Sequence, residues 1–505
     1  SARYRPAEGH ALDAGLYAGR RRQYRTADIL YDQQRTLVTT GETIDELRYF
    51  NENLRERWGD FLLGGLDYTR TFADRSTLTA SALYEYTLLG GPTKNVSLAW
   101  PLNGDTLEYQ RNDNTNPLDG VRLKLDWARP RGEHGREEVG YQYRYLNHTG
   151  DFVYEDVEPG TGRAVRNSAF SNRIRLRRRI HAVYAQHGDR LFDRLDYTAG
   201  LRFEWADRDL TTGDPARATD TTYRLLLRNL FPSAQLGWDV GRGYTLKTAY
   251  SRRIDRATTF MLNPFPEREH NETLEQGDAE LRPELIDAVE AGAVKTFGAS
   301  SVFLTGYYRH VADVVNRVNS LYPPGDTILN RIYTNAGTAR AWGAEAGTQL
   351  QLTRNWKLYA GGNVYRYSIR GDLLGERINT AAVVYSVSAN TTVRLLPTFS
   401  AQAGVNYLSS RITAQGEDGR FYTPDLTLRK TFLNEQWTVA FQWLNIDLGL
   451  LDTQEQRITT ERPRFFTTTN YVYEVDMLQL SVSYHFHPAR QRARLIDSEF
   501  GKEEF

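Results

Sequence analysis

Alternation of apolar and polar residues along short segments is the feature that most constrains what this chain can fold into. In residues 195–205, "LDYTAGLRFEW", every second position is apolar, and most of the residues between are polar or charged. Successive side chains leave a β-strand on opposite faces, so a period of two predicts a strand. We expect Leu201 and Phe203 on its apolar face, with Arg202 and Glu204 on the opposite face. One such strand suits a soluble sandwich as well as a membrane barrel, so the rest of the chain has to decide.

Composition excludes several classes of protein. The chain has 505 residues, no cysteine, and 63 basic against 63 acidic residues. Without cysteine there are no disulfides, zinc–thiolate sites or cysteine nucleophiles. A net charge of zero gives no basis for nucleic-acid binding. The first residues, "SARYRPAEGH", are not a signal peptide, so we expect a mature, trimmed or partial chain.

The hydropathy of the chain is compatible with one kind of membrane protein. No apolar run approaches the roughly 18 residues of a membrane-spanning helix. The mean hydropathy of −0.58 is low. A transmembrane β-barrel tolerates this value, because only one residue in two faces lipid.

The alternation recurs along the whole chain. The polar faces carry mostly small, hydrated or charged groups, and aromatic residues gather near the ends of the apolar stripes, as in the interface girdles of outer-membrane barrels. We therefore predict an all-β fold, a transmembrane antiparallel β-barrel over residues 1–486. Its eighteen strands are expected at 12–33, 60–72, 76–87, 120–130, 137–149, 174–187, 192–205, 229–240, 244–254, 285–296, 300–314, 334–352, 356–368, 380–393, 398–411, 420–430, 435–446 and 472–486.

The predicted connections alternate between short and long. Short ones lie at 72–76, 241–244, 297–300, 395–398 and 432–436, and long ones at about 88–119, 150–173, 206–228, 255–284 and 447–471. Short periplasmic turns and long extracellular loops are typical of outer-membrane barrels. The even strand count returns the last strand to the periplasm. The last predicted strand ends in the aromatic residue Phe486. We expect the residues that follow it, 487–505 ("HPARQRARLIDSEFGKEEF"), to form a charged periplasmic tail with no fold of its own.

Five motifs in order resemble one family, the outer membrane β-barrel proteins of Bacteroidota related to TonB-dependent receptors. Their order and spacing fit across roughly residues 60–486, most of the chain, and each motif is weakly specific alone. The motifs are "YTAGLRFEW" (197–205), "NLFPSAQLGW" (229–238), "YSRRIDRATTFMLNPF" (250–265), "GDAELRPE" (277–284) and "YTNAGTARAWGAEAG" (333–347). Ala257 stands where the family prefers proline, and Asp278-Ala279 replace its Asn-Pro, which affects a loop and its turn chemistry only.

The resemblance also implies parts that this sequence lacks. Related transporters have 22 strands and an N-terminal plug in the lumen, and barrels of that size are expected to be plugged. Here we find no plug, no TonB-contacting segment and about four strands fewer. The simplest explanation is that the sequence is the C-terminal part of a longer protein. A complete eighteen-strand barrel enclosing an aqueous channel is the alternative.

The densest cationic run, "RIRLRRRIHAVY" (173–184), is the first candidate site. On a strand, every second residue from 173 to 179 is an arginine, with Ile174, Leu176 and Ile180 opposite and Arg178 out of pattern. We expect the arginines to face the lumen, either attracting anionic solutes or anchoring a plug. The plainer interpretation, which we favour, is ion pairing with acidic residues of neighbouring strands such as Glu204. The arginines are Arg173, Arg175, Arg177 and Arg179.

The second candidate site is the loop "TTFMLNPFPEREHNETLEQGDAE" (258–280). Its Phe265, Glu267 and His270 are candidates for extracellular ligand contact, because loops on rigid scaffolds often carry binding. Equally, its own proline, phenylalanine and leucine residues could simply pack the loop. The nine histidines show no metal-binding spacing such as H-E-x-x-H, and no catalytic pair or nucleotide-binding loop can be chosen. We expect no metal, no cofactor and no enzymatic activity.

The leading functional hypothesis is the barrel of a TonB-dependent-type transporter in the outer membrane of a Gram-negative bacterium, importing a scarce or bulky ligand. Two alternatives remain: a plugless channel, and a scaffold or secretion-associated barrel bound to another outer-membrane protein. Expected partners are outer-membrane lipid, lipopolysaccharide and, through a plug, a TonB-type energy-coupling system. The sequence does not name the ligand.

Overall fold

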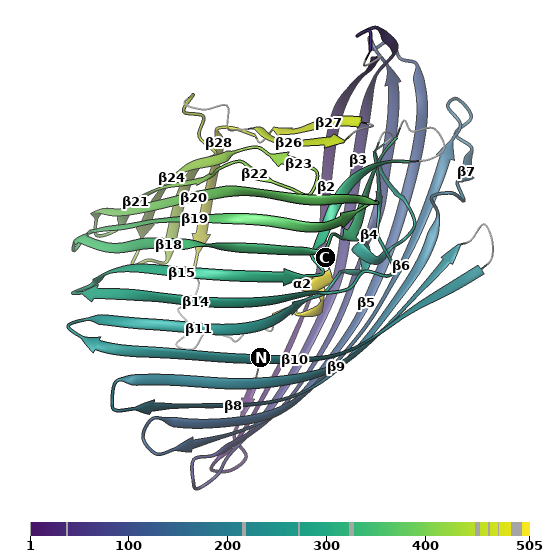
Figure 1. Cartoon of the computed structure of the whole chain (residues 1–505). Helices are drawn as coiled ribbons and strands as arrows, with labels where there is room; N and C mark the ends of the chain where they lie inside the picture. Colours follow the sequence, from purple (N-terminus) through teal and green to yellow (C-terminus); the bar gives the residue numbers. More distant parts are fainter. Residues whose placement is uncertain are drawn as a thin grey trace.

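Long antiparallel strands, each paired with the next in chain order, build the main sheet of the computed structural model (Figure 1). The structure describes residues 2–36, 39–214, 219–270, 273–322, 328–449, 455–462, 465–472, 474–485 and 497–504. Within these residues the sheet has 20 strands, of which β1 (Ala2–Tyr4) and β7 (Ala164–Arg166) have three residues each. The others are β2 (His10–Thr36), β3 (Thr43–Thr71), β4 (Thr77–Ala99), β5 (Thr106–Arg131), β6 (Gly135–Val157), β8 (Asn172–Leu191), β9 (Leu195–Asp214), β10 (Thr219–Gly241), β11 (Tyr244–Asp255), β14 (Glu284–Phe297), β15 (Ser300–Ala312), β18 (Thr338–Thr353), β19 (Trp356–Leu373), β20 (Glu376–Leu396), β21 (Phe399–Leu408), β24 (Phe421–Phe432), β25 (Trp437–Leu444) and β28 (Met477–Tyr484).

Each of the eighteen predicted strands coincides with one of these long strands, in the predicted order. The observed strands extend further at the end that carries the long connections: β4 continues to Ala99, where the prediction ended at residue 87. In this extension Asn95 pairs with Asn53 on one side and Gln110 on the other. Gly90, Gly91, Pro92 and Lys94 interrupt the apolar stripe that marks the strand within lipid, so periodicity did not find this extension.

Short turns join the strands at the opposite end of the sheet. Arg242 and Gly243 connect β10 to β11 with φ angles of 54° and 77°. Two positive φ angles in a two-residue loop define a type I′ turn, whose twist matches that of the flanking strands. A Cβ on Gly243 would collide with the carbonyl oxygen of Thr296, so glycine is required at this position.

The sheet curls around a central space without closing (Figure 1). At one end β1 pairs only with β2, and at the other β28 pairs only with β25. Among the described residues no pairing joins these two ends. The wall of a barrel is therefore present, with two free edges. In hydrocarbon such edges must be paired, because each unsatisfied backbone group costs several kcal/mol.

The long connections are folded rather than irregular. Residues of two of them form a four-stranded sheet, with β13 (Thr273–Gln276) parallel to β17 (Ile328–Asn335), flanked by β12 (Glu267–His270) and β16 (Val315–Tyr322). A second four-stranded sheet contains β22 (Arg411–Ile412), β23 (Gly416–Asp418), β26 (Glu455–Arg462) and β27 (Phe465–Val472). The described helices are α1 (Thr259–Leu262) and α2 (Phe500–Glu504). Neither has the length and apolar character needed to cross a membrane.

The largest buried apolar cluster lies on the concave face of the main sheet. Leu118, Leu176 and Leu210 of the sheet are fully buried there, under Leu262 from α1 and Phe500 from α2. On the convex face large apolar side chains remain open, as at Leu304, which is 57% exposed. The hydrophobic effect would disfavour this convex surface in water, and lipid is the environment that covers it.

Candidate functional site

The two faces of β9 separate as the alternation predicted. Leu201 and Phe203 are 49% and 41% exposed on the convex face. Between them, Arg202 donates a 2.7 Å hydrogen bond to Glu204 on the concave face. Glu204 also accepts a 2.5 Å hydrogen bond from Arg256, which follows the end of β11. The concave face is thus the polar inner wall, and it is the candidate functional surface.

The prediction that the four arginines of 173–179 face this inner wall is wrong, because the structure places them on the convex face. Arg173 pairs with Asp151 at 3.1 Å, Arg175 donates to Asn147 at 3.0 Å and Arg179 lies 3.5 Å from Asp207. Arg177, in the same row, is paired in register with Asp209. These four residues share the convex face with Val183, which is 53% exposed. The opposite row, predicted to face lipid, is buried on the concave side, with Ile174, Leu176 and Ile180 at 1%, 0% and 3% exposure.

The error has a physical cause. Charged side chains avoid the convex face only within the hydrocarbon layer, and this part of β8 lies beyond it. The rings of Tyr143, His181 and Trp205 form a cluster on the convex face, with centroids 4.9 Å and 5.8 Å from the central histidine. Such an aromatic group marks the membrane interface. The arginines lie between this aromatic group and the long connections. The favoured ion-pair interpretation is confirmed for Arg173 and Arg179, whose partners are Asp151 and Asp207 rather than Glu204.

Three other arginines carry the inner-wall chemistry. Arg178 donates to the carbonyl of Ala257 at 2.8 Å, and Arg208 donates to the carbonyls of Ala279 and Leu281, both at 2.9 Å. Burial lowers the pKa of the Arg256 guanidinium, and the Glu204 carboxylate opposes that shift. Together these side chains fasten the connection between β11 and β14 to the wall. The sequence singled out Arg178, because it is the one arginine of its run that falls on the opposite face from the other four. No sequence pattern pointed to Arg208 or Arg256.

The connection predicted as a candidate ligand loop is packed against the wall and against itself. Leu262, Leu274 and Leu281 are fully buried, which confirms the packing interpretation. Phe265 is half-buried and its backbone N–H donates to the Asn263 side chain at 3.3 Å. Glu267 and His270 are the first and last residues of β12, and the His270 side chain lies outside the described residues. Contact of Phe265, Glu267 and His270 with a ligand stays a prediction.

The last described residues also lie on the inner wall, beside the sheet rather than beyond it (Figure 1). Glu499 contacts Arg122 at 2.5 Å, and Glu504 contacts Arg178 at 3.1 Å. Phe500 between them is 2% exposed. This differs from the expected periplasmic tail without a fold, at least for residues 497–504. Residues 486–496 lie outside the described residues.

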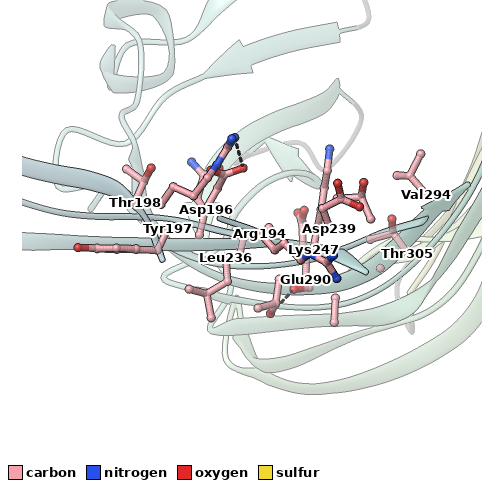
Figure 2. Close-up of a pocket in the computed structure, with 18 of the residues that line it drawn as sticks. Arg194, Asp196, Tyr197, Thr198, Leu236, Asp239, Lys247, Glu290, Val294 and Thr305 are labelled. Atoms are coloured by element: carbon pink, nitrogen blue, oxygen red, sulfur yellow. Dashed lines mark hydrogen bonds and ion pairs between the residues drawn. The ribbon is translucent and has the colours of Figure 1, made fainter. Parts of the chain in front are cut away.

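A polar hollow occupies the inner wall toward the short turns (Figure 2). Its volume is about 630 Å³, and Asp196, Asp239, Lys247 and Glu290 line it. A neighbouring hollow of about 430 Å³ shares Glu290 with it, so the two form one trough along β8 to β15. Because the trough carries both acidic and basic side chains, it suits contact with a hydrated polar solute or with a protein domain. Within the described parts of the chain no group of three metal-ligating side chains comes together.

An apolar convex face, a polar concave face, short turns at one rim and long connections at the other define an outer-membrane β-barrel protein. The chain belongs to the outer membrane protein beta-barrel family, whose family model matches residues 70–484. The protein is therefore located in the outer membrane. A comparison with curated proteins gave no match.

Solved structures with the same fold include bacterial uptake receptors. The siderophore receptor PiuA from Acinetobacter baumannii is 12% identical, with a TM-score of 0.58, and the match covers 95% of this chain and 78% of that one. The ferric-catecholate import receptor Fiu from E. coli K12 is 10% identical, with a TM-score of 0.57 and coverage of 96% and 79%. The ferric yersiniabactin uptake receptor FyuA from Yersinia pestis is 13% identical, with a TM-score of 0.51 and coverage of 92% and 76%.

Proposed function

We propose that this chain is the barrel of an outer-membrane TonB-dependent-type transporter that imports a scarce or bulky ligand, with no enzymatic step. The observation that carries the proposal is the inward fold of the long connections. Arg178 and Arg208 hold the connection between β11 and β14 on the wall through carbonyls of Ala257, Ala279 and Leu281. A passage narrowed by ordered protein suits selective capture, whereas an open diffusion pore needs an unobstructed lumen.

The polar trough supports the same proposal. Its side chains of both signs, such as Asp239 and Lys247, match the needs of a wall that contacts a folded plug. A plug in this position would couple the barrel to a TonB-type system at the inner membrane. The named structures of the same fold are described as a siderophore receptor, a ferric-catecholate import receptor and a ferric yersiniabactin uptake receptor, and we propose a ferric siderophore complex as the first ligand class to test.

Energy-dependent uptake tests the proposal. We expect a strain lacking the gene to lose uptake of a radioactive ferric catecholate siderophore, and the native full-length gene to restore it. A protonophore should abolish the restored uptake, because TonB-type coupling draws on the inner-membrane proton gradient. Uptake of unrelated small sugars serves as the control and should be unchanged.

The alternatives give different results in the same assay. A plugless channel would admit small sugars without regard to the protonophore. A scaffold would transport nothing and would instead co-purify with a large outer-membrane partner. Either outcome would contradict the transporter proposal.

A further inference from the structure

The inner wall contains a built pocket whose occupant is the C-terminal segment of the chain itself. We propose that Glu85, Gly120, Arg122, Arg144 and Arg178 form a docking site for a short acidic segment with a phenylalanine anchor. Residues 498–504, "SEFGKEE", are its reversible occupant in this chain. The proposal goes beyond transport and holds whether or not the chain imports a ligand.

The shape of the pocket fits the phenylalanine ring. Phe500 is 2% exposed and belongs to the cluster of inner-wall leucines that includes Leu83 and Leu118. Beneath the ring lies Gly120 of β5, where an added Cβ would collide with the ring carbons. The Arg144 guanidinium lies 5.0 Å from the ring centroid, which adds a cation–π contact. The absence of a side chain at Gly120 therefore leaves the space that the Phe500 ring fills.

Glu85 of β4 holds the backbone of the segment. Its carboxylate accepts hydrogen bonds from the N–H groups of Glu499, Phe500 and Gly501 at 2.9, 3.0 and 2.8 Å. The Ser498 hydroxyl donates a fourth bond at 2.7 Å. The first N–H groups of a helix have no partner within the helix, so this wall carboxylate replaces the missing acceptors. Glu85 is fully buried under the segment.

Opposite charges complete the match. Arg144 contacts Glu499 at 3.1 Å and Glu503 at 2.7 Å. Arg178 contacts one carboxylate oxygen of Glu504 at 3.1 Å. The second oxygen accepts hydrogen bonds from the backbone N–H and the hydroxyl of Thr259 at 2.7 and 2.8 Å. Side chains of α1 and of strands far away in sequence thus converge on one segment.

Docking and folding of the segment form one equilibrium. A helix of five residues has no stability in isolation, because its nucleation cost is not recovered. The side of α2 away from the wall is open, with the Lys502 side chain 67% exposed. Release of the segment from the wall therefore unfolds it and exposes the side chains of Arg122, Arg144 and Arg178 together with the inner-wall leucines. Those groups would then accept another acidic, aromatic-bearing segment.

A spin label on the segment tests the proposal directly. These 505 residues contain no cysteine, so Lys502→Cys introduces a labelling site at an exposed position, and any cysteine elsewhere in the full-length protein is first replaced by serine. We expect an immobile spectrum in the otherwise unchanged chain. Gly120→Ala should lower the docking equilibrium constant roughly tenfold or more, because its methyl group occupies the position of the ring. Gly64→Ala is the matched control, since an added Cβ there meets only Leu16 at 4.0 Å.

A second substitution removes the dependence on the wall variant. Phe500→Ala alters only the occupant and should also mobilise the label. Adding Gly120→Ala to Phe500→Ala should have no further effect, because the collision no longer exists. Heat-modifiable migration on gels confirms that each barrel is folded. A mobile label in the unsubstituted background, or equal spectra for Gly120→Ala and Gly64→Ala, would overturn the proposal.

Discussion

Replacing Glu204 by leucine is expected to lower the free energy of unfolding by about 3–5 kcal/mol, the cost of breaking a buried ion pair. The Glu204 side chain is 8% exposed, and it pairs with Arg202 at 2.7 Å and Arg256 at 2.5 Å. Arg202 is 29% exposed and retains access to water, whereas Arg256 is 17% exposed and would be left without its counter-charge. Urea titration of the protein refolded in phospholipid bilayers measures the change.

Two further variants identify the cause of this loss. Asp196→Leu breaks an ion pair of similar length, 2.7 Å to Arg190, but the Asp196 side chain is 60% exposed. Its loss should cost less than about 1 kcal/mol. Adding Arg256→Met to Glu204→Leu removes the unpaired charge and should recover most of the stability. Equal costs for Glu204→Leu and Asp196→Leu would show that burial does not govern this pair.

Replacing Leu201 by arginine is expected to cost about 2–4 kcal/mol of the free energy of unfolding in a bilayer. Leu201 lies midway along the apolar stripe of β9, and its side chain is 49% exposed on the convex face. The substitution places a charge in hydrocarbon while leaving the inner wall unchanged.

Thr198→Arg is the control on the same strand. Thr198 lines the polar trough of the inner wall, so an added charge there stays hydrated. We expect a loss below about 1 kcal/mol at this position. Similar losses at both positions would contradict the assignment of the two faces of β9.

The strands could be predicted from sequence because their signal is local. A period of two in apolar residues identifies a strand and its lipid face wherever hydrocarbon covers one side, as at Leu201 and Phe203. The same rule failed for Arg173 and Arg179, because beyond the aromatic group at His181 the convex face lies outside the hydrocarbon layer. There the apolar side chains of Ile174 and Leu176 are buried by the folded connections instead of by lipid.

The inner-wall site could not be predicted because its parts match only in three dimensions. Gly120 and Glu85 carry no signal as isolated residues, and the segment around Phe500 has no periodicity. Their relation depends on the register that aligns β4 with β5 and on a chain end more than 370 residues away. Similarly, Arg208 is one of many charged residues in the sequence until the fold places two carbonyls beside it.

The central claim is that one face of this sheet meets lipid and the other encloses a polar interior. Single cysteines at four positions of β9, labelled with a fluorophore, test it in native outer-membrane protein reconstituted with nitroxide-bearing lipid. Positions 201 and 203 should be strongly quenched by the lipid, and positions 198 and 202 weakly quenched but open to a water-soluble quencher. Equal quenching by water-soluble reagent at all four positions would contradict the claim.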